Sequence, residues 1–343
     1  MMEPALELLA GYGPDLRNGF TNHAPMAVEA LAALGRADAV MPWLEAYRPL
    51  LMPRPAPRER VRRDDWRAAL GKLDRVADWN TFFVEELEEG PWRDVLARWT
   101  ARFAPALCAS AMHGVIRVAH AARSLAEAES PARIRELAEG LGYWAAAHQT
   151  LPADEGPPAK LRAPEAIRKV PVVPPGDRRF AGTIVSSLEG LAAFPAFAPV
   201  IGLLDVSGPP AAVLSDLSET FARVYLSNAH DFLTAIVFIH GVTSVAALRS
   251  LLPYLPEPDA TAALRYAWQG SCALYATFGT IAPGTGAIAP PRESRATLID
   301  MAIANGDEHA IKFTEACLHE DELKPSPVYL AAARHAIGIL ARA

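Results

Sequence analysis

Cysteine is scarce in this chain, and its three copies lie too far apart to form a recognisable motif. Cys108, Cys272 and Cys317 are odd in number and widely spaced in a sequence of 343 residues. A disulfide framework needs an even set, and a CxxC metal knuckle needs two cysteines three residues apart. We therefore expect neither, and a reducing cytoplasm fits this composition best.

An excess of positive charge is also missing. The chain has 33 Lys and Arg against 39 Asp and Glu, which gives a net charge of -6. Nucleic-acid binding usually needs a concentrated surplus of basic side chains. The one local exception, PRPAPRERVRR at 53–63, is typical of a solvated loop. We therefore expect no nucleic-acid partner.

The sequence also lacks an obvious export or membrane segment. The N-terminal MMEPALELLAGYG carries acids where a signal peptide needs positive charge. The most apolar run, FLTAIVFIHGV at 232–242, is shorter than the roughly 18 residues of a bilayer span. We expect a soluble, cytoplasmic protein with no membrane partner, and the oligomeric state stays open.

Several catalytic motifs are absent. The sequence contains no GxxxxGK[ST], GxSxG or HExxH. GTGAIA at 284–289 resembles half of a dinucleotide fingerprint, but no strand precedes it and Pro290 and Pro291 follow it. A nicotinamide or flavin would have to bind without a recognisable Rossmann unit.

Apolar residues spaced three and four apart dominate what is present. MAVEALAALGRADAV, WRDVLARWTARF, ARIRELAEGLGYWAAAHQ and PVYLAAARHAIGILARA all show this helical period. Only 170–173 and 182–187 are weak strand candidates, and both lie beside Pro or Gly. The pattern predicts an all-α fold, a large multi-helix bundle that forms a single domain over 1–343.

Proline interrupts the helical pattern at one place above all. Residues 151–180 contain seven prolines, which favour stiff, extended pieces over helix. We expect a long ordered connection there between two helical halves. A second break, FGTIAPGTGAIAPPRES at 278–294, separates a helix rich in Trp and Tyr from the last helices.

Nine histidines are distributed over the chain, and two of them share a helix face. His113 and His120 are seven residues apart, about 20° short of two full turns, and Arg117 falls near the same face. Polar groups on such an apolar helix need partners inside the protein. His319 and His335 stand in polar or terminal settings and are interpreted as surface residues.

Four histidines in four separate helical segments indicate a metal centre. His23 precedes a helix that begins near Pro25, with Thr21 or Asn22 available as its cap; His113, His240 and His309 lie in three further segments. Facing helices in a bundle can each supply one inward ligand. Imidazoles suit iron, zinc, copper or manganese without choosing among them. The alternative is a set of hydrogen-bonded core histidines in a non-catalytic helical binding protein.

The segments NHAPMAVEALAALG, MHGVIRVAHA, FIHGVTS and DEHAIKFTEACL resemble, in this order, the signature segments of the questin oxidase-like family. The resemblance extends from about residue 12 to about residue 320. Its known members include fungal enzymes that oxidise aromatic polyketides of the anthraquinone type. The resemblance implies an all-helical fold and a non-haem iron ion held by four histidines and a carboxylated lysine. By motif the ligands are His23, His113, His240, His309 and Lys312.

The resemblance also implies partners and further roles. The partners would be dioxygen and an aromatic substrate, and Thr243 is a candidate to hydrogen-bond the carbamate or a bound oxygen species. Arg117 and His120 are candidates to bind an acidic hydroxyl or carboxylate of the substrate, or to support the metal ligands from behind. The aromatic residues of 141–149 and 264–279 could line a pocket or belong to the core. For Lys312 the alternative is an exposed lysine paired with Asp307, Glu308 or Glu315.

Three functional alternatives remain at this level. The first is an NADPH-dependent Baeyer–Villiger-type monooxygenase without a bound metal. The second is a metal-dependent hydrolase, since a multi-histidine centre can also activate water. The third is the non-catalytic binding protein. The substrate does not transfer from the fungal enzymes, because those chains are longer than this one.

Overall fold

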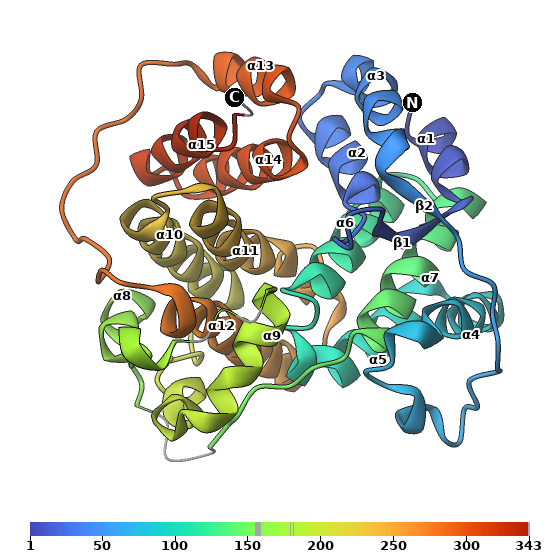
Figure 1. Cartoon of the computed structure of the whole chain (residues 1–343), viewed down its shortest axis with the longest axis horizontal. Helices are drawn as coiled ribbons and strands as arrows, with labels where there is room; N and C mark the ends of the chain where they lie inside the picture. The colour runs from blue at the N-terminus through green and yellow to red at the C-terminus, as the bar shows by residue number, and fades with distance from the viewer. Residues whose placement is uncertain (155–158, 179, 181, 342–343) are drawn as a thin grey trace.

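Helices make up most of the molecule, as the periodicity predicts. The computed structural model describes residues 1–154, 159–178, 180 and 182–341. Figure 1 shows a molecule built mostly of helices joined by loops. The prediction of an all-α fold is confirmed. The α-helices are α1 (Met2–Leu9), α2 (Ala24–Ala33), α3 (Ala37–Tyr47), α4 (Val76–Glu89), α5 (Trp92–Phe103), α6 (His113–Glu127), α7 (Pro131–Ala146), α8 (Ala163–Ala166), α9 (Ile184–Glu189), α10 (Pro210–Asn228), α11 (Phe232–Leu248), α12 (Glu257–Phe278), α13 (Arg295–Asn305), α14 (Glu308–Leu323) and α15 (Pro327–Ile339).

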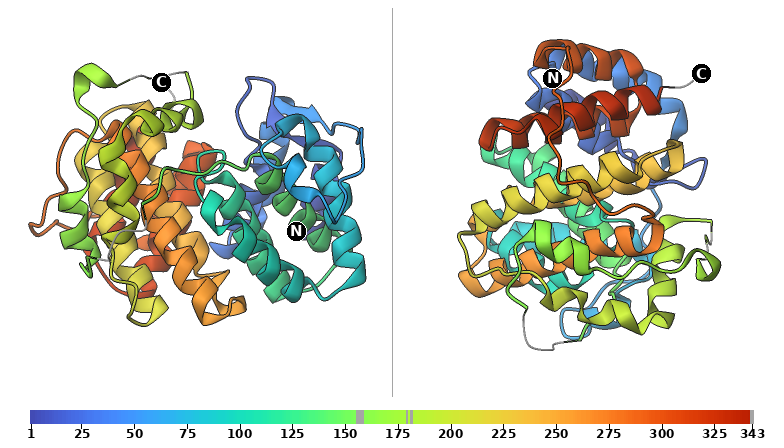
Figure 2. Two further views of the ribbon diagram at one scale, coloured as in Figure 1. Left: turned by 90° about the horizontal axis from the view of Figure 1, so that it is seen from below. Right: turned by 90° about the vertical axis from the view of Figure 1, so that its left-hand side faces the viewer.

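The helices form two groups that follow the order of the chain. In the first group α7 packs on α4 and α6; in the second, α11 packs on α10 and α12, and α14 packs on α15. The left view of Figure 2 shows the blue-to-teal half beside the yellow-to-red half. Neighbours in sequence therefore pack as neighbours in space within each half.

Four helices from both halves close a ring around one point of the interior. α2 packs against α6 and α14, and α11 packs against the same two helices. α2 and α6 belong to the first half and α11 and α14 to the second, so the ring lies where the halves meet (Figure 1). Because every side of the ring is a helix–helix contact, one inward side chain from each helix can meet the other three.

The largest hydrophobic core runs through both halves, and a second, smaller one packs around α1, α2 and α3. In the larger core, the largest side chains include Trp79, Trp99 and Trp144 from the first half and Trp268 from the second, all with at most 1% of their surface exposed. The indole N–H groups of Trp144 and Trp268 donate to the carbonyls of Ala106 and Val200. Those two tryptophans, from the segments proposed to line a pocket, are therefore core residues.

Among the described residues, strand structure is limited to one small antiparallel pair, β1 (Tyr12–Leu16) with β2 (Leu51–Pro53), which α2 and α3 separate in the chain. The two strand candidates of the sequence are wrong: 170–173 is extended without strand partners among the described residues, and 182–187 enters helix α9. The Thr183 hydroxyl accepts a hydrogen bond from the Ser186 N–H. This cap favours helix over the β propensity of the segment.

The proline-rich connection contains only short helices between extended pieces. α8 and two 3-10 turns lie within it, and residues 155–158 and 179 of the predicted segment fall outside the described part of the chain. Residues 279–294 connect α12 to α13 without helix or strand, as the sequence predicts. The 3-10 helices are Arg48–Leu50, Trp66–Ala69, Leu73–Arg75, Ala104–Ala106, Ile167–Lys169, Pro175–Asp177, Gly190–Ala193, Pro195–Gly202 and Leu252–Tyr254.

One helical segment is long and apolar enough to cross a membrane, by length and composition only. It spans Phe232–Tyr254, 23 residues, because the helix continues beyond the run 232–242. The expectation that no segment reaches this length is therefore wrong. In its most apolar window 67% is buried inside the structure, which is typical of a core helix that is apolar all round. The bent pair Ile184–Ala193 and Pro195–Gly202 passes the same test together.

Candidate metal centre

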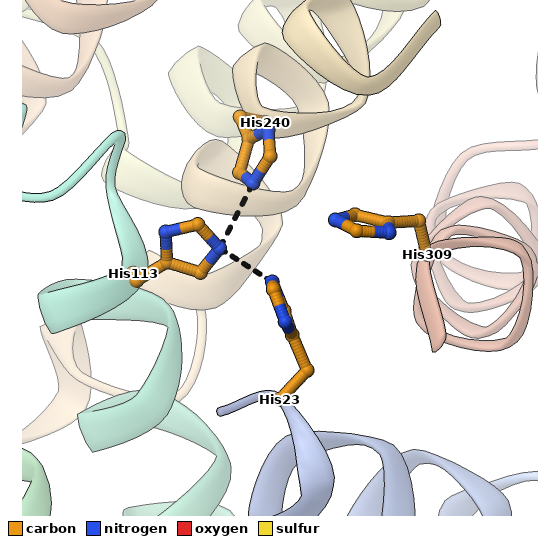
Figure 3. Close-up of side chains that lie close together, drawn as sticks. All are labelled: His23, His113, His240 and His309. Carbon is orange, nitrogen blue, oxygen red and sulfur yellow. Dashed lines mark hydrogen bonds between the residues drawn. The ribbon is translucent and has the colours of Figure 1, made fainter. Parts of the chain in front are cut away.

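The ring of α2, α6, α11 and α14 brings four histidines together. His23, His113, His240 and His309 each offer one ring nitrogen, and these four atoms lie within 4.8 Å of one another. All four side chains are buried. Figure 3 shows the imidazoles converging on one point from four different helices.

Local structure at the helix ends places three of these imidazoles. His23 is the residue just before α2, with Pro25 in the first turn, and His113 and His309 lie at the first and second positions of their helices. The Asn22 side chain accepts a hydrogen bond from the Ala24 N–H, so one predicted cap of α2 is present. His240 differs, because it lies in the middle of α11.

The backbone before His113 has an uncommon conformation. Ser110, Ala111 and Met112 have φ values of 50°, 52° and 68°, in the left-handed region that non-glycine residues rarely adopt. Three such residues in succession cost free energy that the surrounding packing must offset. The strained turn carries the Ser110 carbonyl to Nδ1 of His113, which donates to it.

Hydrogen bonds to the outer nitrogens determine which nitrogen of each ring faces the centre. Nδ1 of His113 donates to the Ser110 carbonyl, and Nδ1 of His240 donates to the Ile236 carbonyl at 2.6 Å. Nδ1 of His309 lies 3.1 Å from Asp307 Oδ1. A ring nitrogen that donates to a carbonyl holds the proton, which leaves Nε2 with a lone pair. Partners of this kind orient metal-binding histidines in general.

Burial keeps the rings of His23, His113 and His240 neutral. It lowers the pKa of His113 to about 3, with Lys312 adding to the shift. It also holds the pKa of His23 and His240 well below the ordinary value, with help from Lys312 for His23 and from His113 for His240. Neutral imidazole is the form that binds a metal ion.

The ring nitrogens that face the centre lie close enough to repel one another, and a bound cation would remove this repulsion. Nε2 of His113 lies 3.1 Å from Nε2 of His240 and 2.6 Å from Nε2 of His23. Since Nδ1 carries the proton in both His113 and His240, two lone pairs face each other. Lone pairs at this distance repel unless a proton or a metal ion lies between or beside them. The donor set therefore fits a transition-metal ion that prefers nitrogen ligands.

Lys312 lies beside this cluster and is buried, with 3% of its surface exposed. The alternative of an exposed, ion-paired lysine is therefore wrong. Within the described part of the chain, its Nζ makes no hydrogen bond or ion pair. Burial lowers the pKa of Lys312 to about 7, although Glu308 and Asp307 oppose the shift. At neutral pH a substantial fraction of such an amine is uncharged, and the uncharged amine can act as a nucleophile.

Thr243 lies one turn after His240 and lines a small pocket together with Lys312. Its hydroxyl donates to the Ile239 carbonyl at 3.0 Å, which leaves its oxygen as an acceptor. The two side chains therefore share one space.

The two candidate substrate-binding residues of α6 both contact carboxylates. Arg117 makes a two-pronged contact with Glu136, at 2.6 and 2.9 Å, and lies deep in the protein. His120 Nδ1 lies 2.5 Å from Glu29 Oε2. The side chain of Arg117 is thus held by its own chain, whereas His120 lies on the wall of the pocket that Lys312 reaches.

Two residues that the sequence did not single out as site residues support the cluster. Asp307 caps α14 through the His309 N–H at 2.8 Å and also contacts His309 Nδ1. Glu308 Oε1 lies 3.7 Å from His23 Nδ1, which has no hydrogen-bond partner among the described residues. The acids next to His309 in DEHAIK were a usable signal, since metal-bound histidines commonly contact a carboxylate.

The remaining histidines lie away from the cluster. His319 and His335 are only half-buried, so their interpretation as plain surface residues is partly wrong. His319 lines the pocket beside Lys312, and His335 Nδ1 lies 3.0 Å from the Tyr225 hydroxyl. His230 is exposed and precedes α11.

The fold and the cluster together define an all-helical protein with a buried four-histidine site that could hold a metal ion. The chain belongs to the questin oxidase-like family, whose model matches residues 20–200, just over half of the sequence. Membership implies an oxidoreductase of the oxygenase kind, acting on a small molecule. No curated protein matches the chain. His23 and His113 lie inside the matched range, whereas His240, His309 and Lys312 lie beyond it and join the first two only through the tertiary structure.

Proposed function

We propose that the protein is a non-haem iron oxygenase that acts with dioxygen on a hydrophobic, aromatic or polyketide-like small molecule. Family membership supports the reaction class. The single observation that supports the metal is the 3.1 Å approach of Nε2 of His113 to Nε2 of His240, with both outer nitrogens engaged by carbonyls. Ferrous iron bound by the four imidazoles would supply dioxygen activation.

In this proposal Lys312 is the fifth ligand, as a carbamate. The neutral amine forms a bond from Nζ to the carbon of carbon dioxide and releases one proton to solvent, which leaves an anionic oxygen. The burial of Lys312 and its lowered pKa support this chemistry. Thr243 would turn its hydroxyl from the Ile239 carbonyl to the carbamate and hold it in place.

The chain also provides a dry, rigid environment for the reaction. The four histidines are buried at the junction of two halves that share one hydrophobic core. Exclusion of water strengthens every electrostatic interaction in such a site. We further propose that residues 1–343 form one domain and that the protein is cytoplasmic; three free, buried cysteines are consistent with a reducing compartment.

The metal content of the purified protein tests the proposal directly. The wild-type chain, His240→Ala and the control His230→Ala would be reconstituted anaerobically with ferrous iron, desalted and measured by elemental analysis. His230 is exposed and lies outside the cluster, so its variant should behave as wild type. We expect about one equivalent of iron in wild type and in the control, and little in His240→Ala, because one neutral ligand is lost.

Two results would contradict the proposal. Equal iron in all three proteins would mean that the cluster does not hold the metal. Oxidation of a polycyclic phenol or ketone by the metal-free protein with NADPH would instead support the Baeyer–Villiger alternative. Oxygen consumption with such substrates, measured with and without NADPH, separates these reactions.

A further inference from the structure

Helices α6, α11 and α14, each of which carries one of the clustered histidines, also line one small pocket. The pocket begins one or two turns after the ligand in every case. From α6 it takes Ala119, His120 and Arg123; from α11, Thr243, Ala246, Ala247 and Ser250; and from α14, Lys312, Glu315, Ala316 and His319.

The two ends of this pocket differ in exposure. Lys312 and Thr243 at the inner end are buried, whereas the Arg123 side chain is 24% exposed and Ser250 and His319 are half-buried. The pocket therefore leads from the surface of the protein to the buried Lys312 side chain. Of the five proposed metal ligands, Lys312 lines the pocket and the four clustered histidines do not. The pocket therefore approaches the proposed metal site through the lysine.

The small volume of the pocket restricts the size of the molecules that can enter it. Its volume is about 30 Å³, whereas sites for drug-sized organic ligands have roughly 300–1,000 Å³. One or two water-sized molecules fit such a space. Four of the lining residues are alanines. An uncharged molecule loses little solvation free energy when it contacts their methyl groups.

Ion pairs hold the polar side of the pocket in a defined position. Arg123 bridges two carboxylates, at 2.7 Å to Glu29 of α2 and at 2.6 Å to Glu315 of α14. His120 shares the same Glu29. These contacts tie α2, α6 and α14 together, and they neutralise charges that would otherwise favour ionic ligands.

We propose that this pocket is the channel by which carbon dioxide reaches Lys312. The inference rests on the proposed carbamate at Lys312, and it adds the route, the lining residues and the size limit. A small, linear, uncharged molecule matches both the small volume and the alanine wall. The aromatic substrate is too large for the channel and must reach the cluster by another path.

Cyanate provides a direct test, because isocyanic acid is a linear molecule of nearly the same size as carbon dioxide. It adds to a neutral amine: Nζ bonds to its carbon, the amine proton passes to its nitrogen, and nothing leaves. The product is a stable carbamoyl-lysine that mass spectrometry counts at each position. The exposed Lys72 in the same sample serves as the internal control for the reagent.

The variants would be Ala247→Leu, which fills the channel, and Ala247→Ser, which leaves it nearly open. We expect Ala247→Leu to slow carbamoylation of Lys312 by at least about tenfold, because close-packed interiors leave no detour for even small molecules. Ala247→Ser should react like wild type, and Lys72 should react equally in all samples. Ala246→Leu is the second blocking variant should Ala247→Leu fail to fold.

Equal rates at Lys312 in wild type and both leucine variants would overturn the channel, as would an unreactive Lys312 in the wild type. The proposed function fails in a different way. If Lys312 reacts through the channel but the reconstituted wild-type protein holds no iron, the route stands and the iron centre does not.

Discussion

Nε2 of His113 and Nε2 of His240 lie 3.1 Å apart at the junction of the two helical halves, although both rings keep their proton on the opposite nitrogen. Two lone pairs at this distance repel each other in an empty site. The residues come from α6 and α11, which belong to different halves of the fold. A bound cation would convert this repulsion into an attraction that holds the halves together.

Ferrous iron should therefore stabilise the folded protein. At a free concentration of 100 times the dissociation constant, a ligand specific for the native state adds about 2.7 kcal/mol. We expect the midpoint of thermal unfolding to rise by several degrees with iron under anaerobic conditions and to fall again with a chelator. Magnesium is the matched control, since it prefers oxygen ligands and should give no shift. Equal stabilisation by both ions would argue against a nitrogen-rich site.

Asp307 should influence iron binding through His309. Asp307→Ala removes the acceptor of His309 Nδ1 and the cap of α14, which should lower iron affinity by about 10–100-fold and stability by about 1 kcal/mol. Asp307→Asn keeps an oxygen at the same place and should lose much less of both. Iron titrations and urea unfolding measure the two effects, and equal affinities in the two variants would contradict the orienting role.

Lys312 should make the stability of the metal-free protein depend on pH above neutrality. Burial lowers its pKa to about 7 in the folded state, from 10.5 as the ordinary value. Between these values the unfolded chain holds one more proton, so stability rises by about 1.4 kcal/mol per pH unit. Below pH 7 both states are protonated and the full penalty is present.

Urea unfolding of metal-free protein in buffers free of carbon dioxide tests this dependence. Lys312→Met keeps a similar volume without the amine, so its stability should lack the Lys312 contribution to the slope. The informative quantity is the difference between wild type and variant from pH 7 to pH 9.5. A difference that stays constant with pH would show that Lys312 is not protonated differently in the two states.

Arg117 should contribute to stability rather than to substrate binding. Its guanidinium pairs with Glu136 in the buried interior, and removal of one partner of such a pair costs about 3–5 kcal/mol. We expect Arg117→Met to lower the free energy of unfolding by this amount, and Arg117→Met with Glu136→Gln to recover part of it. KM for a phenolic substrate should stay unchanged at temperatures where the variant is folded. A large rise in KM would restore the substrate-binding interpretation.

Gly114 should be needed for the position of His113. A Cβ atom at Gly114 would lie 2.6 Å from the Trp144 ring, which cannot move far because its N–H donates to Ala106. Gly114→Ala should therefore push α6 from α7 and cost about 1–3 kcal/mol. Iron affinity should fall as well, since His113 is the preceding residue. Gly190→Ala, where a Cβ atom meets nothing within 4 Å, is the control and should leave iron binding unchanged.

Much of the fold could be predicted from the sequence because helix formation is local. The three-and-four spacing of apolar residues located the main helices, and Pro25 indicated one of their starts. Short β-branched segments were less informative: 182–187 became a helix once Thr183 capped it. The length of the apolar helix at 232–254 was underestimated, since a helix extends beyond its most apolar run.

Residue types and family resemblance indicated which histidines could form a centre, but they could not supply its geometry. His23 and His309 are separated by most of the chain, and whether their rings meet depends on how α2 and α14 cross. The partners of Arg117 and Lys312 depend on the same crossings. Arg117 pairs with Glu136 on a neighbouring helix. The Nζ of Lys312 makes no ion pair within the described part of the chain.

The sequence by itself determined that the protein is helical, that four helical segments each carry a histidine and that a lysine follows one of them by a single turn. The tertiary structure alone decided that the four imidazoles converge and that a small pocket leads to Lys312. It also placed the Ser110 and Ile236 carbonyls so that the lone pairs on Nε2 of His113 and His240 face the centre. The physical reason is the range of the forces involved. Helical periodicity is set by hydrogen bonds four residues apart, whereas tautomer, burial and access are set by packing between residues far apart in the chain.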